Sequence, residues 1–389
     1  MGVLYNWFVG HRLHLWRIRS FILLGMGIPL NLVLASSLEP VPPGRLDDSI
    51  KSKLFKNAHL IVAKGLTTDF EKSVGPQKIY DLASLTKPFG TALLFAAYWS
   101  QGKVSPQSKV TDVLPDFTRF SDVTFEELLT HTSGLATEIP SRLEQKYTKV
   151  SQRIGAIRDH ALLDRKNRGF NYSDIGYDVL GYALEKIGGK SLSEAVTSEV
   201  FTPLGLDNDV KFFAGNGSLP QDEIAAKYYP HALGHAGLFA SAHGVLALNQ
   251  RLFEAAYGLT GSNVWTREVA QAMLRVVSGG RGYAFDFLSP YADMVRGSCY
   301  AKGESFGHSG YVGTSIWTEP SSRNNAAPRT IVLLTDTTII DRSEKSRASL
   351  NQLRHELATW ACRNFKDDEP STVLPKHIDF GILNFLFKN

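Results

Sequence analysis

The sequence has few cysteines and almost no excess of one charge. Only Cys299 and Cys362 occur among 389 residues. Their spacing alone does not bring two Cα atoms within bridging distance, so two separate buried thiols are favoured over a disulfide. The formal net charge is +4, and the first 35 residues contain three arginines and no acid. The remainder therefore lacks the basic surface of a nucleic-acid-binding protein. No internal repeat or low-complexity tract is visible, which argues against a repeat architecture.

Motifs for metals and phosphates are also missing. No glycine-rich phosphate loop with a lysine is present, and no His-Glu-x-x-His pattern accompanies His231, His235 and His243. The sequence therefore predicts no metal and no cofactor.

The N-terminus has the pattern of an export signal. A positive region spans 11–19, an uncharged stretch spans 20–38, and Val33-Leu34-Ala35 resembles a cleavage site. We expect residues 1–35 to be a signal peptide and 36–48 a linker, with export to the periplasm or the extracellular space. Pro29 and Asn31 interrupt the apolar run, yet an uncleaved membrane anchor and a buried core helix stay open as alternatives.

Hydrophobic patterning over residues 49–364 predicts one α+β domain. Strand patterns occur at 58–64, 67–73, 305–318 and 330–335, and a helical pattern covers 344–364. Helical patterns dominate 105–260. This order predicts an α/β/α sandwich, an antiparallel sheet flanked by helices with an inserted all-helical subdomain. Residues 365–389 form a tail to which no role is assigned.

Ser84 and Lys87 form the first candidate for chemistry. Positions i and i+3 are neighbours on a helix, so the lysine can act as the base that a serine nucleophile needs. Pro88 predicts that this helix begins close to Ser84, which puts the hydroxyl near the positive end of the helix. Lys87 must be neutral to act as a base, so we expect its pKa to be lowered. The Ser-x-x-Lys spacing alone is weak evidence for catalysis, because Ser100 and Lys103 repeat it at a helix end.

Several segments around this pair resemble one family, the β-lactamase-related serine hydrolases. This family includes class C β-lactamases, D-alanyl-D-alanine carboxypeptidases and related esterases. The segments follow the family order and cover roughly residues 45–364; they are Tyr80–Pro88, Gln101–Pro106, Val113–Phe117, Leu128–Leu135 and Gly234–Ala242. The resemblance implies the β-lactamase/transpeptidase-like fold and an acyl-enzyme on the serine.

The family's Tyr-x-Asn element corresponds to Tyr172-Ser173-Asp174. The resemblance implies that Tyr172 relays protons with Ser84 and Lys87. Asp174 replaces the family's asparagine, so it offers no amide donor to a substrate and tends to hold Lys87 charged. Capping of the following helix is the alternative role for Asp174.

The family's Lys-Thr-Gly element corresponds to His308-Ser309-Gly310. By resemblance, the backbone N–H groups of Tyr311 and Ser84 form the oxyanion hole, and the three residues line the substrate site. Gly310 is expected to let the substrate approach the strand. His308 replaces a permanent cation with a group that titrates near neutrality, which weakens binding of a substrate carboxylate.

A second serine motif is a decoy. Gly303–Gly307 fits the nucleophile elbow of α/β-hydrolases around Ser305, but that motif needs a following helix and the sequence after Gly307 is β-prone. His131 lies in a segment that the family uses as a structural turn, and it receives no catalytic role.

The sequence thus predicts an exported serine hydrolase, foremost a penicillin-binding-protein-like D-Ala-D-Ala carboxypeptidase or peptidase. An esterase or β-lactamase of the same fold is the alternative, because Asp174 and His308 depart from the β-lactamase pattern. A catalytically silent protein that binds muropeptides or a partner is the alternative of another class. Substrates are expected to be small molecules or peptidoglycan peptides, with membrane contact only through the N-terminal segment.

Overall fold

The computed structural model describes residues 43–213, 219–259, 263–320, 328–337 and 344–364. The strands are β1 (Ala58–Lys64), β2 (Thr67–Val74), β3 (Tyr80–Asp81), β4 (Val210–Phe212), β5 (Leu238–Ala240), β6 (Phe306–Ser309), β7 (Ser315–Glu319) and β8 (Arg329–Thr335). The helices are α1 (Pro43–Lys51), α2 (Leu93–Ser100), α3 (Val110–Val113), α4 (Phe125–Leu129), α5 (Ser141–Glu144), α6 (Val150–His160), α7 (Asp174–Gly188), α8 (Leu192–Val196), α9 (Thr202–Leu204), α10 (Glu223–Lys227), α11 (Ala242–Tyr257), α12 (Arg267–Met273), α13 (Pro290–Val295) and α14 (Glu344–Asn364).

One five-stranded antiparallel sheet joins the two ends of the domain. Its strand order is β2-β1-β8-β7-β6, and β1 pairs with β8 over its whole length, from Ala58 opposite Thr335 to Lys64 opposite Arg329. The predicted strands and the predicted antiparallel sheet are therefore confirmed. Because every pair is antiparallel, strands more than 200 residues apart in sequence share one sheet without a parallel crossover.

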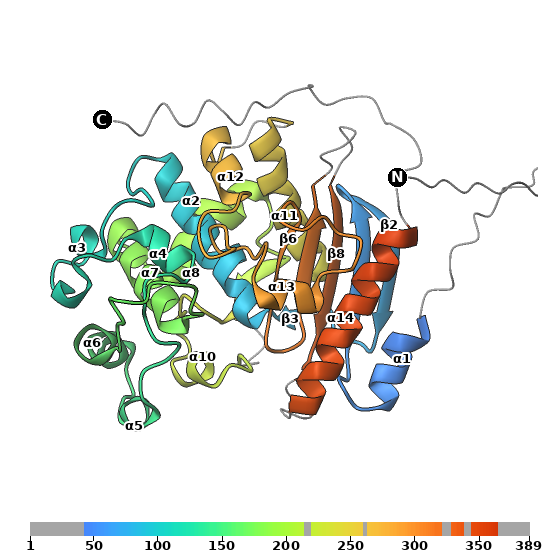
Figure 1. Ribbon diagram of the computed structural model, residues 1–389, viewed down its shortest axis with the longest axis horizontal. Helices are drawn as coiled ribbons and strands as arrows, with labels where there is room; N and C mark the ends of the chain where they lie inside the picture. The colour runs from blue at the N-terminus through green and yellow to red at the C-terminus, as the bar shows by residue number, and fades with distance from the viewer. Residues whose placement is uncertain (1–42, 214–218, 260–262, 321–327, 338–343, 365–389) are drawn as a thin grey trace, which may run out of the picture. The chain divides into compact units, whose positions relative to one another are not determined.

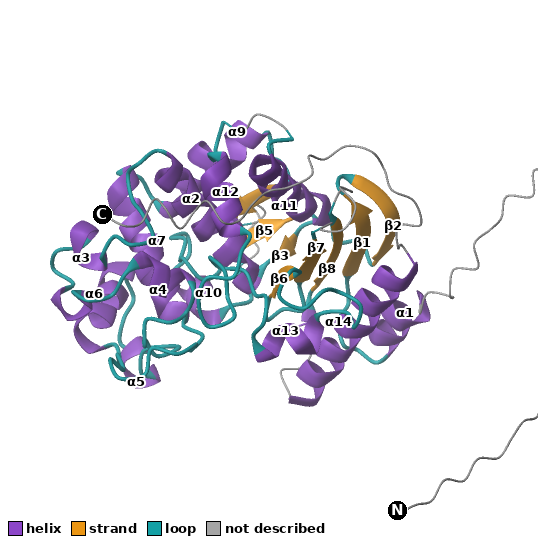
Figure 2. Cartoon of the chain, turned by 45° about the horizontal axis from the view of Figure 1, so that its top comes forward, coloured by secondary structure: helices purple, strands orange, loops and turns teal. Residues whose placement is uncertain are grey.

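Helices cover both faces of this sheet, as Figures 1 and 2 show. Leu60 and Val62 of β1 pack in one core with α1, α13 and α14, whereas Ile61 and Ala63 pack in the other core with α2 and α11. Burial on both faces explains why β1 is apolar without alternation. The sheet is thus the middle layer of the predicted sandwich.

The inserted region is not entirely helical, contrary to the expectation. A second, three-stranded sheet of order β3-β5-β4 lies within the chain that links the halves of the large sheet. Its strands are two or three residues long, which is too short for a period-two pattern to stand out in the sequence. β3 leads directly into the turn that carries Ser84.

The expected linker is shorter than predicted. Helix α1 begins at Pro43, so the last part of 36–48 is helical. Proline suits the first helical position because its missing N–H has no partner to lose there. The signal peptide 1–35 and the tail 365–389 lie outside the described residues. Within the described ranges no helix has both the length and the apolar character needed to cross a membrane.

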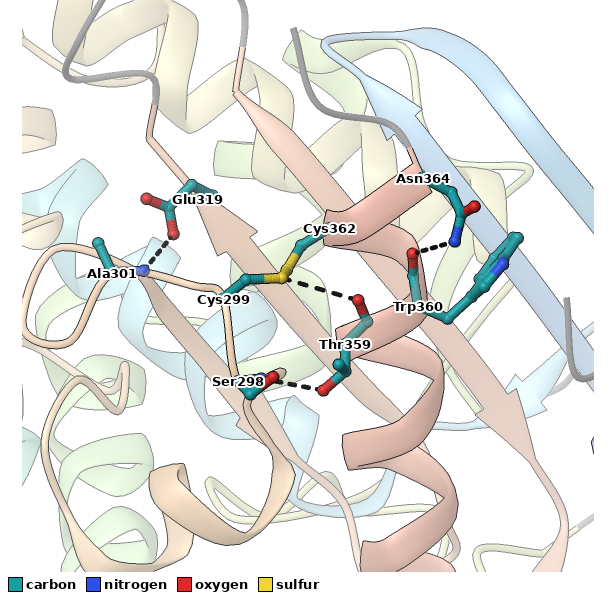
Figure 3. The surroundings of a disulfide bond; sticks show 8 residues. All are labelled: Ser298, Cys299, Ala301, Glu319, Thr359, Trp360, Cys362 and Asn364. Atoms are coloured by element: carbon teal, nitrogen blue, oxygen red, sulfur yellow. Dashed lines mark hydrogen bonds between the residues drawn. A yellow bond between two sulfur atoms is a disulfide. The ribbon is translucent and has the colours of Figure 1, made fainter. Parts of the chain in front are cut away.

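Cys299 and Cys362 form a disulfide, so the preference for two separate buried thiols was wrong (Figure 3). Their Cα atoms lie 6.2 Å apart, within bridging range. Cys362 belongs to α14, and the loop after α13 brings Cys299 beside it. Only the packing of α13 against α14 places the two residues together, so their spacing in sequence carried no such signal.

Candidate active site

Ser84 lies on a sharp turn between β3 and the helical segment that follows. Ala83, just before it, adopts a left-handed conformation with φ 45°, which a side chain rarely accepts without support. Asp81 supplies that support, because its Oδ1 accepts a 2.9 Å hydrogen bond from the Ala83 N–H. The 3₁₀ turn 83–85 and the π-helical stretch 87–92 follow, so the helix begins close to Ser84 as Pro88 predicted.

Lys87 lies fully buried beside Ser84. Its Nζ donates to the Ser84 Oγ at 3.2 Å and to the His235 carbonyl at 3.2 Å. The Asp174 Oδ1 lies 2.6 Å from the same Nζ. The predicted neighbours Ser84 and Lys87 are therefore brought together, with a carboxylate as the third partner.

The lowered pKa expected for Lys87 is not found. Burial alone lowers the pKa of Lys87, but the Asp174 carboxylate and the Tyr172 hydroxyl raise it above its ordinary value. Lys87 is therefore an ammonium group in the resting site, as the aspartate at position 174 suggested. A charged Lys87 donates to Ser84 and accepts no proton from it.

Tyr172 is held between Lys87 and His131. The Lys87 Nζ lies 4.9 Å from the centre of the Tyr172 ring, and the His131 ring stacks on the Tyr172 ring with their centres 4.4 Å apart. The His131 Nδ1 accepts from the Ser173 N–H at 3.0 Å, so the ring proton is on Nε2. Burial, Arg281 and Lys87 keep the pKa of His131 well below 6.5. His131 thus positions Tyr172 as a neutral ring, within the turn that the sequence suggested.

Asp174 is not the cap of helix α7. Ser173 has that role, because its Oγ accepts from the Gly176 N–H at 3.1 Å. Asp174 takes the first helical position, and its carboxylate reaches Lys87. Of the two roles left open for Asp174, the structure supports the contact with Lys87.

His308 lies on β6 in the same cleft, but it does not titrate near neutrality as expected. Its side chain is 4% exposed, and burial, followed by the charges of Arg281 and Lys87, holds its pKa well below 6.5. Among the described residues, neither ring nitrogen has a hydrogen-bond partner. The position that carries a lysine in the family's Lys-Thr-Gly element therefore holds a neutral side chain here. The two ring nitrogens of His308 are available to hydrogen-bond a ligand.

Gly310 is required by the protein's own packing. A Cβ atom at this position would lie 2.2 Å from the Thr314 Oγ1 and 2.6 Å from the Leu82 carbonyl oxygen. Arg354 of α14 holds the same turn, because its guanidinium donates to the Gly310 carbonyl at 2.7 Å. The turn after β6 thus packs directly on the segment that carries Ser84, and the expected approach of a substrate at Gly310 stays a prediction.

The predicted residues converge on one open cleft of about 580 Å³. Its described lining includes Ser84, Tyr172, Asp174, His308, Ser309 and Tyr311, together with Gln221, Asp222, Glu223, Arg281 and Arg347. The side chains that the sequence pattern singled out come from three separate segments. Ser84 and Tyr311 border the same space, as an oxyanion site between their backbone N–H groups requires.

Sequence reasoning missed a buried charge network behind Lys87. The His235 Nδ1 lies 2.7 Å from Asp178, and its Nε2 lies 3.3 Å from Asp222. Burial lowers the pKa of His235, but these two carboxylates raise it well above 6.5. Arg153 holds the far side of Asp178 at 2.8 Å. The Gly234–Ala242 segment carried only a family resemblance in the sequence; the contacts of the His235 ring with Asp178 and Asp222 show why a histidine is buried there.

Arg281 is a second missed residue of the cleft. Its guanidinium is 2% exposed and pairs with Asp286 at 2.9 Å. The intervening residues lie in turns and isolated bridges, so no periodic pattern marked them.

The other serine motifs and the remaining histidines considered in the sequence lie apart from this site. Ser305 is fully buried, and its Oγ donates to the Ala301 carbonyl; strand β6 follows it, as expected, and not a helix. Ser100 lies at the end of α2, where its Oγ accepts from the Thr266 N–H. His231 and His243 do not join His235, since they contact Glu185 and Glu71 instead.

Comparison with known proteins agrees with this geometry. The Beta-lactamase family model matches residues 55–356. The teichoic acid D-alanine hydrolase of Staphylococcus aureus is 28% identical over 174 residues, which are 42% of this chain and 43% of that protein. The match thus spans less than half the length of this curated relative.

Two solved structures share the fold. EstCE1, a hydrolase with promiscuous acyltransferase activity, has a TM-score of 0.63 at 19% identity, covering 80% of this chain and 97% of its own. FmtA from Staphylococcus aureus has a TM-score of 0.58 at 17% identity, covering 85% of this chain and 89% of its own. At these identities the likeness concerns the fold alone.

Proposed function

Because the chain belongs to the β-lactamase family of serine hydrolases, we propose that Ser84 is its nucleophile and that its substrate is a D-alanyl ester. The Ser84 oxygen attacks the ester carbonyl carbon and forms the acyl-enzyme, and the C–O bond to the leaving alcohol breaks. Water then attacks the acyl-enzyme and releases D-alanine. The oxyanion of each step is placed between the Ser84 and Tyr311 N–H groups.

Proton transfer in this proposal involves Lys87, Asp174 and Tyr172 together. The proton of Ser84 passes to the Lys87 amine once that amine is neutral. Lys87 first loses its own proton to water, because a charged Lys87 paired with the Asp174 oxygen at 2.6 Å cannot accept another proton. Tyr172, packed against Lys87, gives its hydroxyl proton to the leaving alkoxide and takes a proton back from the Lys87 ammonium group.

The observation that carries the choice of an ester is the buried His308, whose two ring nitrogens have no hydrogen-bond partner among the described residues. A peptide that ends in D-Ala-D-Ala has a terminal carboxylate. The lysine of the family's Lys-Thr-Gly element would attract this carboxylate, and His308 takes its position here. His308 offers hydrogen bonds without that charge, because its pKa lies well below 6.5. A D-alanyl ester has an alcohol leaving group and needs no such cation. The curated relative's name, teichoic acid D-alanine hydrolase, supports the same choice.

A D-Ala-D-Ala carboxypeptidase is the second candidate, and Arg347 favours it. Its guanidinium carbon lies 5.4 Å from the centre of the Tyr311 ring at the rim of the cleft. A cation at this rim can attract a substrate carboxylate without help from His308. The two candidates share the acylation step and differ in the leaving group.

We also propose that the enzyme acts outside the cytoplasm. The N-terminal pattern of an export signal supports this location. A disulfide between Cys299 and Cys362 supports it independently, since disulfides persist in oxidising compartments.

Covalent labelling and a substrate panel test the proposal. The folded protein is treated with a fluorophosphonate, and mass spectrometry locates the adduct. We expect labelling at Ser84 in the wild type and in Ser100→Ala, the control that removes the serine of the repeated pattern. A folded protein that takes no label at Ser84 would overturn the nucleophile.

The choice between substrates rests on kcat/KM for a D-alanyl glycerol ester and for an N-acylated D-Ala-D-Ala peptide. We expect the ester to be preferred at least tenfold. The reverse order, together with labelling of Ser84 by a fluorescent penicillin and loss of peptide cleavage in Arg347→Gln, supports the carboxypeptidase instead. Ser84→Ala controls for hydrolysis that does not depend on the site.

A further inference from the structure

Three side chains that bind metals well meet on the far edge of the large sheet, apart from the residues that line the cleft. They are His59 of β1, Glu71 of β2 and His243 of α11. The His59 Nε2 lies 2.7 Å from the Glu71 Oε1, and the His243 Nε2 lies 3.1 Å from the same oxygen. The two imidazole rings are 5.8 Å apart and meet edge to face.

The sheet register explains why these residues meet. His59 pairs with Ser73, and Ile61 pairs with Glu71, so both ligand side chains of the hairpin share the face that carries Ile61. Ile61 packs in the core that contains α11. Ser241 caps α11, which fixes where this helix begins and therefore directs His243 in its first turn toward the hairpin.

We propose that His59, Glu71 and His243 bind one Zn²⁺ ion. Two imidazole nitrogens and one carboxylate oxygen form a known zinc ligand set that leaves a fourth position for water. The three ligand atoms all lie within 4.8 Å of one another. Ligands at about 2.0–2.2 Å from zinc in a tetrahedral site lie about 3.3–3.5 Å apart, so only small side-chain movements complete the site.

The burial of His59 and the exposure of Glu71 and His243 suit the binding of an ion from solution. The His59 side chain is 8% exposed and is therefore held in place by its surroundings. The side chains of Glu71 and His243 are 39% and 52% exposed, which gives the ion a path of entry. Both histidines already direct Nε2 at one carboxylate oxygen, so the ligands are oriented before the metal arrives.

A zinc ion at this place joins three segments that are otherwise separate in sequence. It links the edge hairpin β1–β2 to the start of α11. We therefore assign the ion a structural role that stabilises the hairpin and the helix start together, not a step in acyl transfer.

Zinc titration of the full-length, tag-free protein tests the site. After treatment with a chelator, ZnCl₂ is added during isothermal titration calorimetry, and thermal unfolding is recorded with and without zinc. We expect one ion per chain and a higher unfolding temperature with zinc. We expect at least tenfold weaker binding and loss of the temperature shift in His243→Ala and in Glu71→Gln.

His160→Ala is the matched control, because this exposed histidine ends α6 far along the chain from all three ligands. It should bind zinc as the wild type does. Both ligand variants alter exposed side chains, so circular dichroism should show them folded. Absorption of a tetrahedral site on replacing Zn²⁺ by Co²⁺ should appear in the wild type and vanish in His243→Ala.

The proposal is overturned if the wild type binds no zinc, or if both ligand variants bind it with unchanged affinity. The second result would assign the ion to other histidines of the chain. Neither result bears on Ser84, so the zinc proposal and the proposed function can fail separately.

Discussion

Asp174→Asn tests how the charge of Lys87 controls the site. The Asp174 oxygen lies 2.6 Å from the Lys87 Nζ, and Lys87 is fully buried. Two unit charges at this distance attract by about 6 kcal/mol at an effective dielectric constant of about 20. An asparagine keeps a hydrogen-bond acceptor but removes this attraction, so we expect the pKa of Lys87 to fall.

The reaction rate follows from this change. In the wild type, Asp174 raises the pKa of Lys87, so the neutral amine is scarce at neutral pH and the rate of acylation rises toward alkaline pH. In Asp174→Asn, burial is left as the main influence and lowers this pKa. The rate should level off at lower pH and exceed the wild-type rate near neutrality.

The assay is the second-order rate of fluorophosphonate labelling at Ser84, measured across a series of pH values. Glu223→Gln removes a carboxylate from the lining of the same cleft and should leave the pH profile unchanged. Denaturant unfolding should also show a loss of up to about 3–5 kcal/mol in Asp174→Asn, since one partner of a buried pair is removed. An unshifted pH profile in folded Asp174→Asn would refute the reasoning, because Asp174 would then not set the pKa of Lys87. Loss of labelling at every pH would also refute it and would mean that Asp174 assists acylation directly.

Three further predictions concern stability and packing. Reduction of the bond between Cys299 and Cys362, 63 residues apart, should lower the free energy of unfolding by about 4 kcal/mol, with the double serine variant as the reference that no reductant affects. Gly310→Ala forces its new methyl group against the Leu82 carbonyl and should cost about 1–3 kcal/mol; labelling of Ser84 should fall further than the folded fraction does. His235→Gln should cost about 3–5 kcal/mol in denaturant unfolding, because it removes a buried cation between two carboxylates. Since the folded pKa of His235 lies above its unfolded value of about 6.5, its contribution is complete below about pH 6.5 and declines as pH rises through the folded pKa. A wild-type stability curve parallel to that of His235→Gln from about pH 6 to about pH 9 would contradict this assignment.

Features that depend on neighbouring residues, such as apolar runs and helical spacing, could be predicted from the sequence. The apolar run of β1 and that of β8 predicted buried strands, and their order around a helical middle predicted the antiparallel sheet. The pair Ser84 and Lys87 was readable for the same reason, because helical spacing decides that positions three apart are neighbours.

Contacts between segments that are distant in sequence could not be predicted from such local patterns. The sequence alone favoured unpaired cysteines and a His308 that titrates near neutrality, and both expectations were wrong. No local pattern marked Asp178, His235 and Asp222 as one buried group. The three residues proposed to bind zinc have no motif spacing, because they come from two strands and a helix.

The sequence by itself determined where the strands of the large sheet lie, where the helix with Ser84 begins, and which side chains have the chemistry for acyl transfer. The tertiary structure alone decided the contact between Asp174 and Lys87, the neutrality of His308 and the pairing of the cysteines. The physical reason is that element formation depends on near neighbours and on periodicity. Protonation and disulfide pairing depend on distance, burial and charges across the fold, which are set only when segments far apart in the chain pack together.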